Sequence, residues 1–197
     1  MKILNIIVLN ANNYSLEDLL KSPYLNDENI KEIEKITHPL AKKEKTASFI
    51  LKNKYVGKYY IREDGKPVSD SCYFSVSHSF GLTMIVIDDK PVGIDVEKIR
   101  EVDDKMIDYV SSKEEKEYIN NSETFFEVWT SKESLLKCLG IGIRTKLKEI
   151  NSLPIDGFKT YDGRTYCNRS VRYEDYVVSI IDENHERFHI TFVEETI

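Results

Sequence analysis

Two carboxylates lie two residues apart in an otherwise apolar run, Pro91 to Lys98 (PVGIDVEK). The run predicts a strand in which Asp95 and Glu97 project from one face, while Ile94 and Val96 project from the other. Like charges about 7 Å apart on one strand face repel each other unless a cation lies between them. Carboxylates without a histidine or cysteine beside them suit Mg²⁺ better than zinc. A strand end that simply reaches solvent would explain the same pattern, so both interpretations stay open at this point.

A second group of charges lies in a predicted helix that runs from Glu123 to Leu139. At 100° per residue, its apolar side chains form one broad arc. Lys132 falls inside this arc and Glu133 falls beside it, where a charge without a partner is costly. Lys137 follows Glu133 by four residues and shares its side of the helix. A surface ion pair has the same spacing, but the placement of Glu133 on the apolar side favours a functional site.

Serines alternate with other side chains in Tyr73 to Ser79 (YFSVSHS), which predicts a strand. In this strand Ser77 and the other serines lie on one face, whereas His78 lies on the opposite face. Ser77, His78 and the glycine at 81 would suit a turn that contacts phosphate, although a histidine satisfied by packing is the alternative. No Ser-His-Asp arrangement, GxSxG motif or P-loop occurs in the sequence.

Charge is spread unevenly along the 197 residues, whose formal net charge is −6. Residues 31–66 hold ten basic and five acidic side chains, a net charge of +5, and the rest of the chain holds 18 basic and 29 acidic ones, a net of −11. The acidic total argues against general binding of nucleic acid. The basic segment would suit a phosphate-rich ligand or an acidic partner, and a solvated, lysine-rich helix face is the alternative.

Cysteine usage indicates a reducing compartment, and hydropathy indicates no membrane span. The three cysteines, Cys72, Cys138 and Cys167, are widely spaced and form no CxxC motif, so we expect a cytoplasmic protein without a disulfide framework. The first residues, MKILNIIVLN, predict an N-terminal strand and carry no convincing leader cleavage site. No apolar run approaches the length of a membrane span.

The order of the predicted elements favours an α+β fold. Helices are expected after Ser15, near Asp27 and from Leu40 to about Tyr55, followed by strands up to Glu97. Helices follow again, with a capping box at Ser112 and Glu115 and the long helix that Gly140 ends. Short strands complete the chain from about residue 158. The pattern resembles one α+β unit written twice.

Taken together, these segments resemble the 4′-phosphopantetheinyl transferase superfamily, and specifically its larger single-chain type. The resemblance rests on four blocks in the family's order: GKP at 65–67, SVSHS at 75–79, PVGIDVEK at 91–98 and VWTSKESLLKCLGIG at 128–142. The joint pattern of GID followed by WTSKESxxK is specific. The loop after the last block, residues 143–146 (IRTK), does not closely match the loop that often guides the family's substrate.

The resemblance implies a pseudo-dimer of two similar α+β halves, residues 1–90 and 91–197, with the active site in the cleft between them. It also implies an activity. The protein would transfer the 4′-phosphopantetheine arm of coenzyme A to a serine of an apo acyl or peptidyl carrier protein. The reaction would depend on Mg²⁺ and release 3′,5′-adenosine bisphosphate. A non-catalytic module of the same fold that binds coenzyme A or carrier proteins is the alternative.

The same resemblance assigns roles to single residues. Asp95, Glu97 and Glu133 would hold Mg²⁺, and Glu133 would act as the base toward the carrier serine, directly or through a water. Lys137 would contact the diphosphate and protonate the departing adenosine bisphosphate. The remaining contacts with coenzyme A would come from Lys45, Thr46, Lys66, Pro67, Ser77, His78 and Lys132. We expect a monomer, because the two halves already supply the cleft, and the charge and hydropathy of the chain predict neither nucleic acid nor a membrane as a partner.

Overall fold

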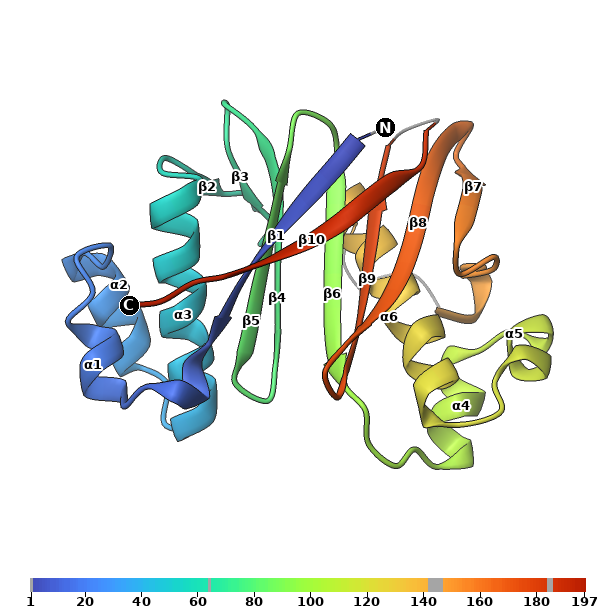
Figure 1. The fold of residues 1–197 in the computed structure, drawn as a ribbon, viewed down its shortest axis with the longest axis horizontal. Coiled ribbons are helices and arrows are strands. Elements are labelled where there is room, and N and C mark those ends of the chain that lie inside the picture. The colour runs from blue at the N-terminus through green and yellow to red at the C-terminus, as the bar shows by residue number, and fades with distance from the viewer. Residues whose placement is uncertain (1, 64, 142–146, 184–185) are drawn as a thin grey trace.

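The computed structural model describes residues 2–63, 65–141, 147–183 and 186–197 of the chain, and its fold is α+β. Two four-stranded sheets lie at the centre, and helices cover them on either side (Figure 1). The first sheet has the order β10-β1-β5-β4 and the second has the order β6-β9-β8-β7. The strands are β1 (Lys2–Asn10), β4 (Tyr73–Ser79), β5 (Leu82–Asp88), β6 (Val92–Lys98), β7 (Gly157–Tyr161), β8 (Arg164–Tyr173), β9 (Tyr176–Asp182) and β10 (Phe188–Glu194). A small hairpin, β2 (Tyr60–Ile61) with β3 (Pro67–Val68), stands apart from both sheets.

Helices form where the sequence predicts them, and their ends carry the expected caps. They are α1 (Leu16–Leu20), α2 (Asp27–Glu34), α3 (Pro39–Tyr55), α4 (Asp104–Val110), α5 (Lys113–Tyr118) and α6 (Ser122–Leu139). Ser112 and Glu115 form the predicted capping box of α5, in which each side chain accepts a hydrogen bond from the other residue's backbone N–H. Gly140 ends α6 in the left-handed conformation, with φ of 72°, which glycine adopts without a steric penalty.

Each sheet packs against one long helix. Buried side chains of α3, among them Leu51, contact the first sheet, and those of α6, among them Leu135 and Leu136, contact the second. A third buried cluster joins residues of both sheets, from Ile6 on β1 to Ile180 on β9. The two halves therefore share one core, although their expected structural similarity stays a prediction.

The edges of the two sheets meet along a row of serine hydroxyl groups. Strands β4 and β6 are both edge strands, and three hydroxyl groups of β4 accept hydrogen bonds from backbone N–H groups of β6. The pairs are Ser75 with Ile94 at 3.1 Å, Ser77 with Val96 at 3.3 Å and Ser79 with Lys98 at 3.2 Å. Because strand side chains repeat every two residues, every second serine reaches the same neighbour. We call this row the serine seam.

The last strand differs from the proposed division of the chain at residue 90. By sequence order β10 falls in the second half, yet it pairs in parallel with β1 of the first sheet, from Lys2 opposite Phe188 to Val8 opposite Glu194. Glu195 then contacts α3, where it accepts a hydrogen bond of 2.7 Å from Lys54. The first half thus includes a strand contributed by the end of the described chain.

Candidate functional site

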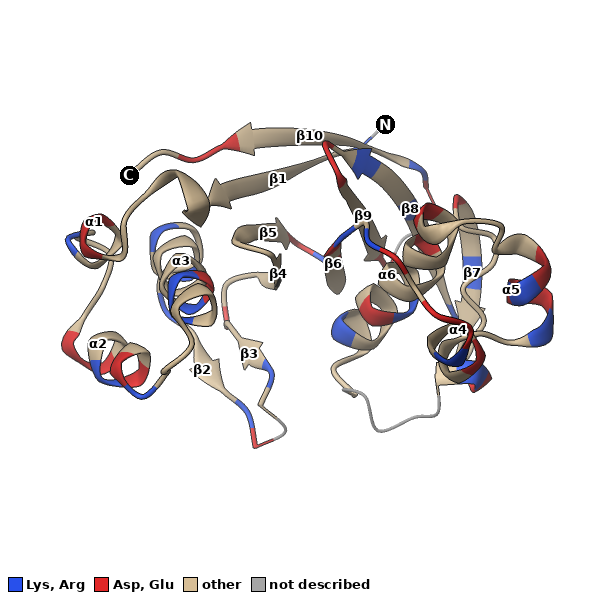
Figure 2. Ribbon diagram, turned by 90° about the horizontal axis from the view of Figure 1, so that it is seen from below, with Lys and Arg blue, Asp and Glu red and all other residues tan. Residues whose placement is uncertain are grey.

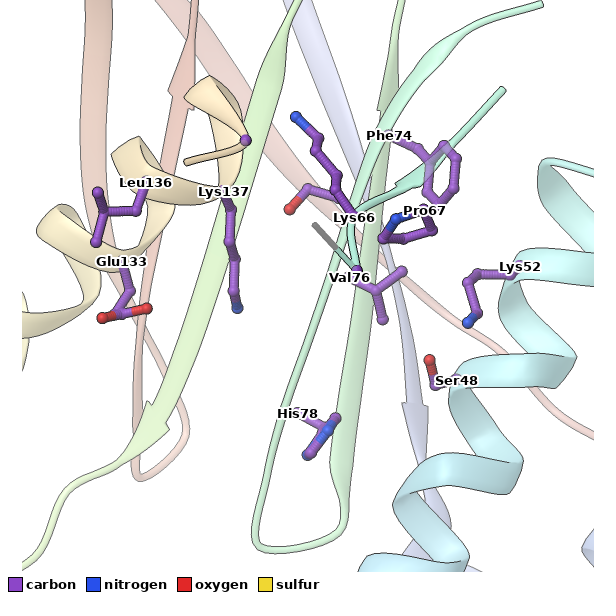
Figure 3. Close-up of a pocket in the computed structure, with 13 residues that line it drawn as sticks. Ser48, Lys52, Lys66, Pro67, Phe74, Val76, His78, Glu133, Leu136 and Lys137 are labelled. Carbon is purple, nitrogen blue, oxygen red and sulfur yellow. The ribbon is translucent and has the colours of Figure 1, made fainter. Parts of the chain in front are cut away.

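A pocket of about 340 Å³ lies between the two halves, next to the serine seam. Helices α3 and α6 flank the place where β4 and β6 meet (Figure 2). Both helices contribute to the pocket wall, as do β4 and the segment that holds the GKP block (Figure 3). The lining residues are Ser48, Lys52, Gly65, Lys66, Pro67, Phe74, Ser75, Val76, His78, Glu133, Leu136, Lys137 and Gly140.

Helix α6 reaches the pocket because it packs directly on β6. A Cβ atom added to Gly93 would lie 1.9 Å from the carbonyl oxygen of Ser134, so only glycine permits this approach. The glycine of the GID motif thereby brings Glu133 and Lys137 of the helix close to Asp95 of the strand. This is the physical reason for a glycine two residues before the aspartate.

Asp95 is 5% exposed and forms an ion pair with Lys137. Its Oδ1 atom accepts a hydrogen bond of 2.7 Å from the Lys137 ammonium and one of 2.8 Å from the Ser77 hydroxyl. Among the described residues, neither Asp95 Oδ2 nor Glu133 Oε1 has a hydrogen-bond partner, although both atoms are buried. Buried carboxylate oxygens without a partner are costly, and their presence together indicates a place for a ligand.

The pKa of Glu133 is far above its ordinary value. Burial raises the pKa of Glu133 to about 7, and the negative charges of Asp95 and Glu97 act in the same direction, against the ammonium of Lys137. The carboxylates of the strand thus disfavour the charged form of Glu133. A cation between them would remove that repulsion.

Glu97 differs from the other two carboxylates because neither of its oxygens is among the buried atoms without a partner. Its Oε2 atom accepts a hydrogen bond of 2.8 Å from Ser79 and one of 3.0 Å from Arg100. Within the described part of the chain, no three His, Cys, Asp or Glu side chains lie close enough together to hold a metal ion by themselves. The oxygen-only donor set nevertheless fits Mg²⁺, which binds to one or two carboxylates and completes its shell with phosphate oxygens and water.

Lysine and histidine side chains surround the rest of the pocket. Lys66 donates a hydrogen bond of 3.1 Å to the carbonyl of Cys138 near the end of α6, and so joins the GKP segment to the second half. His78 lies 3.3 Å from Glu44 and is about half exposed, which excludes the alternative of a packed core histidine. Lys52, Lys66 and Lys137 give the pocket wall a mainly positive character that suits a phosphate-rich ligand.

Lys132 does not lie at the pocket, contrary to its predicted contact with coenzyme A. Its ammonium is fully buried on the other side of α6, where it donates to Glu115 at 2.6 Å and to the carbonyl oxygens of Val110 and Leu147 at 2.7 and 2.9 Å. Glu115 also accepts hydrogen bonds of 2.7 Å from the backbone and hydroxyl of Ser152. A neighbouring lysine, Lys159, donates to Ser131 at 2.9 Å and to the Ser152 carbonyl. We call Lys132, Glu115, Ser152 and Lys159 the closed cluster.

Three further predicted contacts lie beside the pocket rather than on its wall. Thr46 is fully buried and donates a hydrogen bond of 2.8 Å to the Lys42 carbonyl of its own helix, so its contact with a ligand is not supported. Lys45, one residue earlier, is half-buried over the ring of Phe49. Ser77 belongs to the serine seam and bonds to Asp95 and Lys137. It therefore orients the charged groups of the pocket.

Lys52 and Ser48 line the pocket but were not predicted from the sequence. Ser48 lies three residues and Lys52 seven residues after Lys45, on the same face of α3. Three to four residues form one turn and seven form two, so this spacing from Lys45 was the available signal. The alternative interpretation of a wholly solvated lysine face is wrong at Lys52, which is 6% exposed.

The fold and the pocket agree with a comparison of the sequence with known families. The chain belongs to the 4′-phosphopantetheinyl transferase superfamily, whose sequence model matches residues 91–193. That region holds Asp95, Glu97, Glu133 and Lys137, whereas the GKP and SVSHS blocks lie before it. The predicted family is therefore confirmed.

Curated relatives carry the same family name. The chain is 40% identical over 107 residues to the 4′-phosphopantetheinyl transferase gsp of Aneurinibacillus migulanus. The matched region covers 50% of this chain and 43% of that protein. It is 33% identical to psf-1 of Bacillus pumilus over 49% of this chain and 46% of that protein. It is 30% identical to Sfp of Bacillus subtilis (strain 168) over 51% of this chain and 46% of that protein. The chain thus spans about half the length of the curated relatives it matches.

Two further sequence predictions concern a loop and membrane spans. The poorly matching loop at residues 143–146 lies outside the described residues. Across the residues that are described, no helix combines the length and the apolar character needed to cross a membrane.

Proposed function

We propose that this protein is a 4′-phosphopantetheinyl transferase, which moves the phosphopantetheine arm of coenzyme A onto a serine of an apo acyl or peptidyl carrier protein. We further propose that it works in the cytoplasm as a monomer, with neither nucleic acid nor membrane as a partner. The observation that carries the proposal is the convergence of Asp95, Glu133 and Lys137 at one pocket, with two buried carboxylate oxygens that no described residue satisfies. The family membership and the names of the relatives support it.

The transfer requires one bond to form and one to break. The carrier serine oxygen attacks the phosphorus that bears the pantetheine arm, and the bond from that phosphorus to the bridging oxygen of the diphosphate breaks. Glu133, aimed into the pocket, takes the serine proton, and Lys137 gives a proton to the departing 3′,5′-adenosine bisphosphate. A positioned carboxylate base of this kind contributes about 10²- to 10⁴-fold to a rate.

The carboxylates would also hold Mg²⁺. Asp95 and Glu133 offer their unsatisfied oxygens, and Glu97 would join them when Arg100 releases it. Bound there, the ion would neutralise charge that builds up on the diphosphate. Ser77 keeps Asp95 and Lys137 in register by bonding to both, which fixes the positions of the anionic and the cationic group before a ligand arrives.

The proposal is tested by mass spectrometry of a carrier protein. An apo carrier incubated with this protein, coenzyme A and Mg²⁺ should gain the mass of one phosphopantetheine arm, and a carrier whose acceptor serine is replaced by alanine should gain nothing. Omitting Mg²⁺ in the presence of a chelator should suppress the gain. If several diverse carriers gained no mass although coenzyme A bound, the protein would be a binding module and the enzyme assignment would fall.

A further inference from the structure

Arg100 follows β6 in the chain and contacts Glu97, one of the three predicted metal ligands. Its Nη1 atom donates a hydrogen bond of 3.0 Å to Glu97 Oε2 and one of 2.9 Å to the carbonyl oxygen of Lys98. The Ser79 hydroxyl donates to the same carboxylate oxygen at 2.8 Å. Because a carboxylate oxygen has two lone pairs, a cation reaches Glu97 Oε2 only by displacing one of these donors.

Two aromatic rings hold the guanidinium group of Arg100. Its Cζ atom lies 4.6 Å from the ring centroid of Phe126 on α6. It lies 5.6 Å from the ring centroid of Phe80, which belongs to the turn between β4 and β5. A planar guanidinium stacks on aromatic faces while its N–H groups still donate hydrogen bonds. Arg100 therefore approaches Glu97 from a fixed position.

Phe80 keeps its ring in this place at a cost to its own backbone. Its φ angle is 49°, in the left-handed region that residues with a bulky side chain rarely adopt. The carbonyl oxygen of Phe80 accepts a hydrogen bond of 2.9 Å from the Asn12 side chain, which supports the turn in this conformation. Glycine would relieve the strain, but it would also remove the ring that lies over Arg100.

The other two carboxylates of the predicted metal site have no such competitor. Asp95 Oδ2 and Glu133 Oε1 are buried without a hydrogen-bond partner among the described residues. The Glu97 side chain is 21% exposed and forms an ion pair with Arg100. A cation that enters the site thus finds two unpaired carboxylate oxygens, whereas it must compete with Arg100 for the third carboxylate.

We propose that Arg100, held between Phe80 and Phe126, is a positioning residue that keeps Glu97 paired in the ligand-free protein and thereby weakens the binding of a divalent cation. The inference rests on the proposed function, because the cation site is part of it. Arg100 lies outside the sequence blocks that carry the family resemblance. The affinity for the cation is therefore set in part by a side chain that does not itself hold the metal.

Titration of the whole protein with Mn²⁺, followed by electron paramagnetic resonance, tests the proposal. Mn²⁺ binds to oxygen ligands as Mg²⁺ does, and the spectrum measures the unbound ion without any turnover. Arg100→Gln should tighten Mn²⁺ binding to the ligand-free protein about three- to tenfold, because a partly exposed, hydrogen-bonded ion pair no longer competes for Glu97. An affinity that is unchanged or weaker would overturn the proposal.

Two controls separate competition for Glu97 from a general effect of charge. In a Glu97→Gln background, Arg100→Gln should change the Mn²⁺ affinity less than about twofold, since the group for which Arg100 competes is gone. Lys98 is a matched cation, because it lies 5.8 Å from the Phe80 ring centroid but pairs with Asp175 at 3.0 Å. Lys98→Gln should also change the affinity less than about twofold. Equal tightening with and without Glu97 would show a charge effect and overturn the proposal.

A second variant tests the contribution of the Phe80 ring. Phe80→Gly removes the ring and relieves the strained backbone, so Mn²⁺ binding should tighten about two- to fivefold, in the same direction as Arg100→Gln. Both side chains are partly exposed, so neither change leaves a cavity in the core. Mn²⁺ affinity equal to that of the unaltered protein would remove Phe80 from the proposal.

The outcomes distinguish this proposal from the proposed function. Mn²⁺ binding that survives Asp95→Asn would place the cation elsewhere and overturn both the role of Arg100 and the assigned metal site. The carrier assay decides the transferase separately, because it uses the unaltered protein. If Arg100→Gln tightened Mn²⁺ binding while no carrier gained mass, the role of Arg100 would stand and the transferase assignment would fall.

Discussion

Two groups of buried charges lie on opposite sides of helix α6, and they differ in how their polar atoms are satisfied. In the closed cluster, Lys132 has three hydrogen-bond acceptors and Glu115 accepts from the backbone and hydroxyl of Ser152. At the pocket, Asp95 and Glu133 each keep a buried oxygen without a partner among the described residues. Consecutive residues of one helix, Lys132 and Glu133, belong to the two different groups.

The difference shows which property of a buried charge indicates function. Burial is common to both groups, and shifted pKa values occur in both: burial lowers the pKa of Lys159 to about 7 and raises that of Glu133 to about 7. Of these two groups, only the one at the pocket has buried carboxylate oxygens without a partner among the described residues. A perturbed pKa therefore marks a candidate site when polar atoms remain to be satisfied by a ligand, whereas a complete network of protein partners indicates a structural role.

The largest expected effect tests the functional side of this contrast. Glu133→Gln keeps the shape of the side chain but removes the base, so phosphopantetheine transfer should fall about 10²- to 10⁴-fold. Coenzyme A binding should change little by comparison, and the melting temperature should not fall, because a neutral amide relieves the repulsion from Asp95. Single-turnover mass analysis and calorimetry measure the two effects. Transfer at the rate of the unaltered protein would remove Glu133 from its assigned role.

The next effect tests the structural side. Lys132→Met leaves Glu115 as a buried charge without its partner, and breaking such a pair should lower the free energy of unfolding by about 3–5 kcal/mol. Denaturant unfolding followed by fluorescence measures it. Adding Glu115→Gln to Lys132→Met should restore part of the loss, since the second change removes the stranded charge. A single Lys132→Met variant as stable as the unaltered protein would contradict the description of a closed cluster.

A pH-dependent effect of intermediate size should come from Lys159. Because its pKa is about 7 in the folded protein and 10.5 in the unfolded reference, the unfolded chain binds more protons between these values. The stability contributed by this group therefore rises with pH in that window and is smallest at its lower end. Between pH 7 and pH 9 the unaltered protein should gain about 1–2 kcal/mol relative to Lys159→Met. Parallel unfolding curves for the two proteins would show that Lys159 is charged in the fold.

The smallest effect is expected at an exposed ion pair. Lys21 lies 2.7 Å from Glu17, four residues earlier, and both side chains are mostly exposed. Pairs of this kind contribute less than about 0.5 kcal/mol, so Lys21→Ala should leave the free energy of unfolding almost unchanged. Denaturant unfolding in low and high salt provides the measurement. A loss comparable to that of Lys132→Met would mean that burial does not separate strong from weak pairs in this protein.

Local patterns of the sequence predicted most of the fold. The period of two in YFSVSHS, the capping box at Ser112 and the glycine that ends α6 depend on neighbours within a few residues, and all three are confirmed. The parallel pairing of β10 with β1 was not predicted, because it joins segments at opposite ends of the described chain. Hydropathy alone does not specify a strand's partner.

The sequence predicted which residues form much of the candidate site, but it predicted few of the contacts between them. Asp95 and Glu133 were predicted as site residues because they lie in recognisable sequence blocks. The structure places both at the pocket or beside it. The sequence places Lys132 inside the apolar arc of α6. The arc alone does not show whether its ammonium faces the pocket or the opposite side of the helix. Its partner Glu115 lies on another helix, so only tertiary packing reveals the pair. The contact of Lys52 with the pocket likewise depends on where α3 lies.

The return of β10 to the first sheet has a consequence for the order in which the protein forms during synthesis. Of the described strands β1 is made first, whereas β10, its neighbour on one side, is made after all the others. Until then β1 has an open edge, which exposes unpaired backbone groups to other chains. Contacts so distant in sequence also form slowly. The first sheet, against which α3 and its wall of the pocket pack, is thus complete only when β10 has paired with β1.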